Sequence, residues 1–357
     1  MKACIKKLLT ISILIGLISS CQKDNNSPII ESGLYDNGYF VTNEGNFGTG
    51  NGSITFISDD GSVVNNVYES TNGVPLGDVV QSMSIIGEYA YIVVNNSDKI
   101  VVATKDSMIH ITEISINQPR YIKQVSDNKA YITSWGLFGE NADNISVLDL
   151  STNTITSQIT CGSGPEKITL DNNGLAYINN AGGWGTDSTI TVVDIATDSE
   201  ISSIVVGESP NSVQIDVNNN IWVLCTGSSI WTPDENGVWS ATYSKSKLYK
   251  ISNNSILSTF SFSDGPKQNE LVINDDGSKL FYLSSGSVYS MNVNSSILPS
   301  NALISENFDA LAFNENTIFG TDDQGFLVSG YSKEYSTSGV LVNTYNVGMG
   351  PRGFCFN

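Results

Sequence analysis

The chain has 357 residues and a formal net charge of −19, and 15% of its residues are charged. This length fits one large domain or two ordinary ones. So acidic a chain repels nucleic acid and anionic membrane surfaces at long range, and we therefore exclude nucleic acid as a partner.

The first segment, residues 1–20, has the pattern of an export signal. Lys2, Lys6 and Lys7 precede a short apolar run, and Ser19 and Ser20 lead into Cys21. The apolar run is too short to span a bilayer comfortably. Small residues before a cysteine resemble a bacterial lipobox, which implies a lipid on Cys21 and attachment to the outer membrane. The alternative is an ordinary secretory signal with an incidental cysteine.

We expect residues 21–34 to form a tether. The segment 22–26 loosely resembles the tethers that direct such lipoproteins to the cell surface. Removal of residues 1–20 takes away three lysines and no acids, which leaves 14 basic and 36 acidic residues and a formal charge of −22. The remaining cysteines have no metal-like spacing, and we expect them to be buried free thiols. They are Cys161, Cys225 and Cys355.

From residue 35 onward the chain contains a repeated sequence motif. The turn in PEKITLDNNGLAYINNAGG, from Pro165, is typical of a β-hairpin. Successive copies are 40, 46, 45, 56, 42 and 43 residues apart. A period in the forties built only from strands is typical of a propeller blade. The copies begin near Val79 and at Pro119, Pro165, Pro210, Pro266, Phe308 and Pro351.

Each copy has room for four strands, because two further strand-like runs follow the hairpin, as at 145–149 and 154–160. The last copy stops after one inner strand, at 351–357, whereas residues 38–43 form a second strand with no inner strand before it. Pairing the two would close the ring. The sequence therefore predicts an all-β fold, a seven-bladed β-propeller over residues 35–357, with no long helix.

The repeats ISVLDLSTNTITSQITCGSGPEKI and ITVVDIATDSEISSIVVGESPNSV resemble the YVTN-type repeat of YncE-like and surface-layer-like propellers. With the lipobox and the segment NEGNFG at 43–48, the chain is similar to surface lipoprotein propellers of Bacteroides-type bacteria. These include the BtuG group, which captures cobalamin beside a TonB-dependent transporter. The resemblance implies a cell-surface protein that captures a bulky, cobalamin-like corrinoid ligand for such a transporter, although a propeller fold alone does not specify a function.

The repeat predicts that the two faces of the propeller carry different kinds of loop. Short Asp/Asn/Gly turns, at 127–128, 171–174, 216–220 and 275–277, lie on one face and lack the ligand spacing of an EF-hand. The irregular loops 44–52, 134–143, 181–188 and 227–246 lie on the other. We predict that their aromatic side chains bind the ligand, although they could instead pack the loops onto the rim. These side chains are Phe47, Trp135, Phe138, Trp184, Trp231, Trp239 and Tyr243.

A ring of polar residues is predicted where the inner strands begin, on the same face as the irregular loops. Arg120, Lys267 and Arg352 could bind a polar ligand through charge-assisted hydrogen bonds. The ring could equally satisfy its own charges and water. Its other members are Glu166, Asn211, Asp309 and either Val80 or Gln81.

Catalysis is not expected. The single histidine, His110, lies in a strand-like run, which excludes a His-rich metal centre, and the chain has no GxSxG motif. The glycines at 48–52 precede no helix that could hold phosphate. Loop carboxylates could perform glycosidic acid–base chemistry, so a carbohydrate-active or lyase-type enzyme remains an alternative, as does a protein-binding scaffold. They are Glu44, Glu140, Asp143, Asp187, Asp234 and Glu235.

Overall fold

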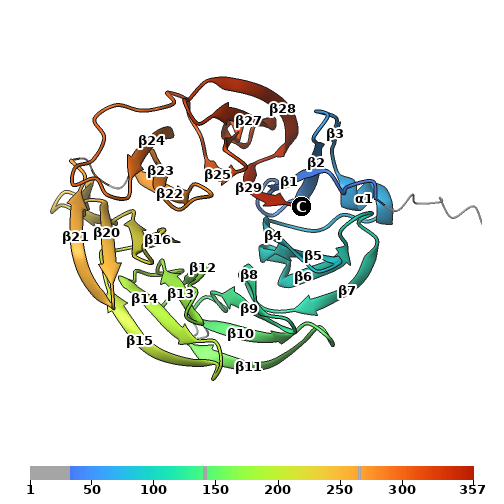
Figure 1. Ribbon diagram of the computed structural model, residues 1–357, viewed down its shortest axis with the longest axis horizontal. Helices are drawn as coiled ribbons and strands as arrows, with labels where there is room; N and C mark the ends of the chain where they lie inside the picture. The colour runs from blue at the N-terminus through green and yellow to red at the C-terminus, as the bar shows by residue number, and fades with distance from the viewer. Residues whose placement is uncertain (1–32, 140–142, 264, 266) are drawn as a thin grey trace, which may run out of the picture. The chain divides into compact units, whose positions relative to one another are not determined.

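The computed structural model describes residues 33–357 except 140–142, 264 and 266. Within this part, seven antiparallel sheets are arranged in a ring, so the expected seven-bladed β-propeller is confirmed (Figure 1). No helix among the described residues is long and apolar enough to cross a bilayer. Cys21, the signal segment and most of the tether lie outside the described residues.

The first four blades each contain four strands, with the inner strand named first. Blade 1 contains β29 (Pro351–Phe356), β1 (Gly38–Asn43), β2 (Ser53–Ser58) and β3 (Val63–Val64). Blade 2 contains β4 (Val80–Ile86), β5 (Tyr89–Val94), β6 (Lys99–Thr104) and β7 (His110–Ser115). Blade 3 contains β8 (Pro119–Ser126), β9 (Lys129–Ser134), β10 (Asn144–Asp149) and β11 (Thr154–Thr160). Blade 4 contains β12 (Pro165–Leu170), β13 (Leu175–Asn180), β14 (Thr189–Asp194) and β15 (Ser199–Val205).

The last three blades depart more from the repeat. Blade 5 contains β16 (Pro210–Ile215), β17 (Ile221–Cys225), β20 (Lys247–Ser252) and β21 (Ser255–Ser261), with the separate hairpin β18 (Ser229–Pro233) and β19 (Trp239–Tyr243) inserted. Blade 6 contains β22 (Gln268–Ile273), β23 (Lys279–Ser284) and β24 (Ser287–Asn292), and a bridge between Val288 and Ile304 takes the place of the fourth strand. Blade 7 contains β25 (Ala310–Asn314), β26 (Thr317–Asp322), β27 (Ser329–Ser336) and β28 (Leu341–Met349).

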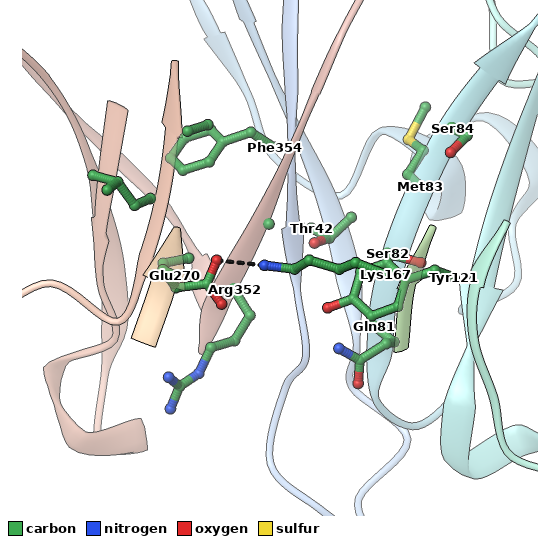
Figure 2. Close-up of a pocket in the computed structure, with 14 residues that line it drawn as sticks. Thr42, Gln81, Ser82, Met83, Ser84, Tyr121, Lys167, Glu270, Arg352 and Phe354 are labelled. Atoms are coloured by element: carbon green, nitrogen blue, oxygen red, sulfur yellow. Dashed lines mark hydrogen bonds and ion pairs between the residues drawn. The ribbon is translucent and has the colours of Figure 1, made fainter. Parts of the chain in front are cut away.

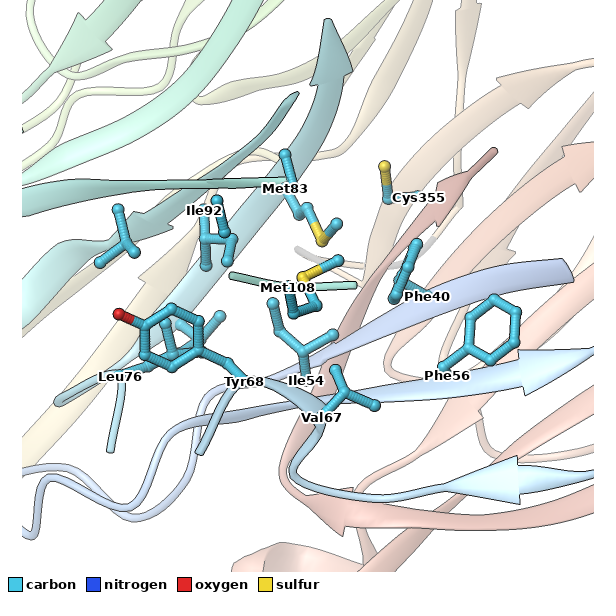
Figure 3. Close-up of a cluster of buried hydrophobic side chains, with 14 of the residues drawn as sticks. Phe40, Ile54, Phe56, Val67, Tyr68, Leu76, Met83, Ile92, Met108 and Cys355 are labelled. Atoms are coloured by element: carbon cyan, nitrogen blue, oxygen red, sulfur yellow. The ribbon is translucent and has the colours of Figure 1, made fainter. Parts of the chain in front are cut away.

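Within the described residues, three short helices join these strands. They are α1 (Val67–Asn72), η1 (Asn95–Ser97) and η2 (Gln324–Phe326). The α1 segment follows the outer strand of blade 1, where Val67 and Tyr68 are buried in the core between blades 1 and 2 (Figure 3). A helix of six residues is too short to produce an amphipathic pattern that could be recognised in the sequence.

The pattern of burial explains the recurring sequence. The second strands are covered on both sides by neighbouring blades, and β5 and β13 are each buried at five of six positions. Such strands read as nearly continuous apolar runs, whereas the outer strand β11 has mostly exposed residues. Of the three cysteines, Cys225 and Cys355 are buried free thiols as expected, while Cys161 is only half-buried.

The ring closes through the two ends of the described chain. Strand β29 pairs with β1 in antiparallel register, from Tyr39 opposite Phe356 to Asn43 opposite Pro351. The ring of Phe356 packs 4.9 Å from that of Phe319 in blade 7, measured between centroids, and 5.8 Å from that of Tyr39. The last strand therefore joins blade 1 to blade 7, which confirms the predicted pairing.

Candidate functional site

Strand direction places the irregular loops on one face. Because the strands in each blade alternate in direction, every inner strand begins on the face where the second strand ends. We call this the loop face; it carries the loops 44–52, 135–139, 181–188 and 226–246 and the starts of the inner strands. The opposite face, the turn face, carries the short turns from inner to second strands.

The turns on the turn face have the structural role that the sequence predicts. Asp171 Oδ1 accepts hydrogen bonds from the backbone N–H groups of Asn173 and Leu175, at 2.8 and 2.9 Å. Asp216 accepts from the N–H groups of Asn218 and Asn220 in the same way, at 2.9 and 2.8 Å. These carboxylates therefore stabilise the turns.

Blades 3 and 4 contribute a compact group of aromatic rings to the loop face, which we call the aromatic cluster: Trp135, Phe138 and Trp184. The centroids of Trp135 and Phe138 each lie 5.6 Å from that of Trp184, and both contacts are edge-to-face. Phe138 is 77% exposed and Trp184 is 49% exposed, whereas Trp135 is half-buried below them. Two large rings are therefore held in place yet remain accessible.

Glycines beside Trp184 allow the two loops to approach closely. A Cβ atom on Gly164 would lie 1.8 Å from the backbone nitrogen of Gly183, and both residues have positive φ angles, of 61° and 55°. A larger residue at either position would clash or be strained. The glycine-rich sequence around Trp184 is thus explained by the close contact between the loop and the crossover into blade 4.

An arginine supports the aromatic cluster from the channel side. The Arg120 guanidinium carbon lies 4.1 Å from the centroid of the Trp135 ring, and Arg120 Nε donates to Glu166 Oε1 at 2.9 Å. Burial raises the pKa of Glu166, and the adjacent Arg120 works against that rise. The side chain of Arg120 therefore positions Trp135 and is already paired with a carboxylate.

The second arginine has a similar role across the channel. Guanidinium nitrogens of Arg352 lie 2.8 Å from a carboxylate oxygen of Asp323 and 3.5 Å from one of Asp309. A third nitrogen lies 3.9 Å from a carboxylate oxygen of Glu44. The guanidinium carbon lies 5.3 Å from the centroid of the Phe326 ring. Burial raises the pKa of Glu44 and of Asp309, and Arg352 opposes both shifts. Both arginines of the polar ring are therefore paired with carboxylates of this protein.

The remaining predicted members of the ring differ in their surroundings. Lys267 is exposed just before β22. Asn211 is half-buried, and its Oδ1 accepts a hydrogen bond from the backbone N–H of Glu270 at 2.9 Å. Gln81 is buried and lines the central channel.

The long insertion in blade 5 is a β-hairpin and not the irregular loop that the sequence suggested. Trp231, Trp239 and Tyr243 lie on β18 and β19 and are 59%, 62% and 57% exposed. Its base is closed where Ser228 N donates to Ser244 Oγ at 2.8 Å. The turn sequence Asn236-Gly237 was the signal that would have identified it.

Phe47 lies apart from both aromatic groups, on the blade 1 loop. Its ring is 78% exposed. The loop around it is held by Gly48 N, which donates to Asp78 Oδ2 at 2.8 Å, and by Asn46 Nδ2, which donates to the Phe326 carbonyl at 3.1 Å. All seven predicted aromatic residues are therefore on the loop face, but they form three separate groups.

Two loop carboxylates of the enzymatic alternative have structural partners. Asp187 accepts hydrogen bonds from Ser163 N at 2.7 Å and Thr189 Oγ1 at 2.6 Å, and Asp234 accepts from Val238 N at 2.8 Å. Glu140 lies outside the described residues. His110 is exposed, and its Nδ1 lies 3.0 Å from the hydroxyl of Tyr68.

Sequence reasoning did not identify two features near the channel. Phe326 and Asp323 contact Arg352 from the blade 7 loop, and Lys167 forms an ion pair with Glu270 inside the channel. Regular alternation would place Lys167 on the opposite side of β12 from Glu166, but the register shift between Pro165 and Ile168 breaks that alternation. The bulge at Glu270 leaves no recognisable pattern.

A family model described as a domain of unknown function, DUF5074, matches residues 37–346. The chain belongs to the DUF5074 family. The match includes strands of every blade, and of the propeller strands it omits only the end of β28 and the closing strand β29. No curated protein matches the chain significantly.

Solved structures share the fold of this DUF5074 chain at low sequence identity. A functionally unknown protein from Desulfotomaculum acetoxidans is 15% identical with a TM-score of 0.65, over 89% of this chain and 99% of its own. A quinonprotein alcohol dehydrogenase-like protein from Bacteroides thetaiotaomicron is 14% identical with a TM-score of 0.62, over 90% of this chain and 78% of its own. AztD from Citrobacter koseri is 9% identical with a TM-score of 0.55, over 89% of this chain and 97% of its own. Similarity at this level concerns the fold only.

Proposed function

We propose that this protein is a non-catalytic binding protein that captures a bulky ligand on the loop face. The observation that carries the proposal is that most of the exposed aromatic side chains among the described residues lie on this face. Phe138, Trp184, Trp231 and Trp239 are each between 49% and 77% exposed although their loops are held by specific contacts. Exposed apolar groups of this kind mark binding surfaces, and aromatic anchors supply much of the energy of binding.

The exposed area is large enough to matter energetically. A Trp side chain buries up to about 250 Å², so covering the exposed half of Trp184 would remove roughly 125 Å² from water. At about 25 cal/mol per Å² this contributes roughly 3 kcal/mol. A ligand that covers several of the rings at once would therefore bind strongly, which favours a bulky ligand with apolar faces.

A cobalamin-like corrinoid is the first candidate for this ligand. It is large enough to contact more than one aromatic group, and the resemblance to surface lipoprotein propellers favours it. In the same proposal, a lipid on Cys21 holds the protein at the outer membrane, where it passes the ligand to a TonB-dependent transporter. The paired arginines at the inner-strand starts would then orient the loops.

Equilibrium titration with cyanocobalamin tests the proposal. The wild-type protein should bind it, and Trp184→Ala/Trp239→Ala should weaken binding at least tenfold, a loss of at least about 1.4 kcal/mol. The matched control is Tyr89→Ala/Val217→Ala, which removes exposed apolar groups from the turn face. If the wild type does not bind cyanocobalamin, the corrinoid assignment fails. If both double variants bind as tightly as the wild type, the loop-face site fails.

A further inference from the structure

The central channel contains a small cavity that the loop-face site does not use. It has a volume of about 160 Å³ and is lined by inner strands of several blades together with Thr42 of β1. A cavity of about 150 Å³ can hold a molecule the size of benzene. The channel cavity is therefore large enough for a compact molecule and too small for the bulky ligand proposed above.

Three uncharged polar side chains line this cavity, and the hydroxyl of one of them, Thr42, is buried without a hydrogen-bond partner among the described residues. Thr42 is 1% exposed, and its Oγ1 is buried without a partner. The Tyr121 hydroxyl and the Gln81 amide also line the cavity, and burial raises the pKa of Tyr121 to about 12, so its hydroxyl remains a donor. Buried polar groups are normally paired, so the unpaired Thr42 hydroxyl beside two further polar side chains points to something that binds in this cavity.

The absence of a side chain at Gly353 keeps the space beside Thr42 open. A Cβ atom at this position would lie 2.7 Å from Thr42 Oγ1. Gly353 also lines the cavity. A side chain at this position would therefore press against the Thr42 hydroxyl, which is itself buried at the wall of the cavity.

An ion pair crosses the cavity between blades 4 and 6. Lys167 Nζ donates to Glu270 Oε2 at 2.7 Å, as Figure 2 shows. Burial alone would lower the pKa of Lys167, but Glu270 beside it raises the pKa above its ordinary value. An ammonium group has three donors and a carboxylate has several acceptor sites, so both keep hydrogen-bonding capacity for a ligand.

The backbone of Glu270 is held in an unfavourable conformation. Its φ angle is 52°, in the left-handed region that glycine prefers, and Asn211 Oδ1 accepts its N–H. Non-glycine residues in this region cost of order 1–3 kcal/mol and cluster at functional sites. Inner strands of other blades have a similar register shift, but in β22 the shift contains Glu270, whose carboxylate contacts Lys167 in the channel.

The two ends of the cavity differ in polarity. Arg352 and Gln81 lie on one side of the ion pair, and Met83 and Phe354 lie on the other (Figure 2). A ligand that fits both ends needs adjacent charged groups of opposite sign and an apolar part. A neutral zwitterion would give both Lys167 and Glu270 a group of opposite charge.

We propose that the channel cavity binds a small zwitterion with an apolar side chain, such as an aliphatic α-amino acid. Its carboxylate would accept from Lys167 and Tyr121, and its ammonium group would donate to Glu270 and Thr42. The aliphatic side chain would contact Met83 and Phe354. This site is independent of the proposed capture of a bulky ligand.

Calorimetric titration with L-valine, up to about 10 mM, tests this site. The wild-type protein should bind L-valine at least tenfold more tightly than isovalerate or isobutylamine, which each lack one charged group. Absence of L-valine binding, or equal binding of isovalerate or isobutylamine, would overturn the assignment.

Variants locate the binding in the channel. Lys167→Met and Glu270→Gln should each weaken L-valine binding at least tenfold, and Tyr121→Phe, which removes only a hydroxyl, should weaken it several-fold. The matched control is Lys333→Met, because Lys333 forms an ion pair with Glu306 at 2.6 Å in blade 7. Unchanged affinity in all three channel variants, with melting curves that show folded protein, contradicts the proposal. Trp184→Ala/Trp239→Ala should bind L-valine normally, which separates this test from that of the loop face.

Discussion

At the scale of single residues, Asp216 shows how a turn residue becomes part of the core. Its side chain accepts a hydrogen bond from Trp222 Nε1 at 3.0 Å, and Lys250 Nζ lies 3.7 Å from its Oδ2. The sequence identified the turn but not these contacts, because they depend on how Trp222 and the neighbouring strand pack. Burial acts to raise the pKa of Asp216, but hydrogen bonds from Trp222 and Asn220 outweigh it, so the pKa is lowered.

The variant Asp216→Asn should lower the free energy of unfolding at pH 7 by about 3 kcal/mol, because it leaves buried donors poorly paired. A carboxylate with a lowered folded-state pKa contributes stability above its unfolded pKa of about 3.9 and loses it as the pH falls through the folded value. The difference between wild type and variant, measured by urea unfolding, should therefore shrink below about pH 4. A difference that stays constant down to pH 2 would contradict this account.

At the scale of elements, the repeat predicted the strands well and the insertions poorly. Second strands such as β5 and β13 are recognisable because neighbouring blades cover both sides. The β18–β19 hairpin interrupts blade 5 and has no core of its own, so its strands do not show the repeat pattern. Likewise, the partners of Trp135 and Trp184 depend on loop contacts between blades, which no local pattern encodes.

Replacement of residues 229–243 by Asn-Gly should preserve the fold and weaken ligand capture. The hairpin is mostly exposed, and Ser228 and Ser244 already close its base. An isolated two-stranded hairpin contributes little to stability. We expect the melting temperature to change by no more than a few degrees while affinity for cyanocobalamin falls at least tenfold. A variant that unfolds, or one that retains full affinity, would show that the hairpin has another role.

At the scale of the whole molecule, ring closure could be predicted from the sequence, whereas the ion pair in the channel could not. The unpaired segments at 38–43 and 351–357 left one way to complete the seventh blade, and the structure pairs them. The cavity with Lys167 and Glu270 arises only when strands from blades 4 and 6 face each other across the ring. Such contacts join residues about 100 positions apart, for which a repeat pattern gives no signal.

Truncation after Gly350 should destabilise the entire ring. It removes the partner strand of β1 and the Phe354 and Phe356 rings that pack near Tyr39. Loss of a fully buried Phe side chain costs about 3–5 kcal/mol, so loss of these two partly buried rings, of buried Cys355 and of the pairing with β1 together exceeds about 5 kcal/mol. The truncated protein should lack a cooperative thermal transition, whereas deletion of Asn357 alone should retain one. A truncated protein with the wild-type melting temperature would contradict ring closure as a stabilising feature.

The central claim is that the loop face is the binding surface of this propeller. Hydroxyl-radical footprinting of the protein with and without cyanocobalamin tests this claim most directly. We predict protection of Phe138, Trp184, Trp231 and Trp239 in the complex and unchanged reactivity of Tyr89 and Val217. Protection confined to Tyr89, Val217 and the other turn-face residues, with the four loop-face rings still reactive, would contradict it.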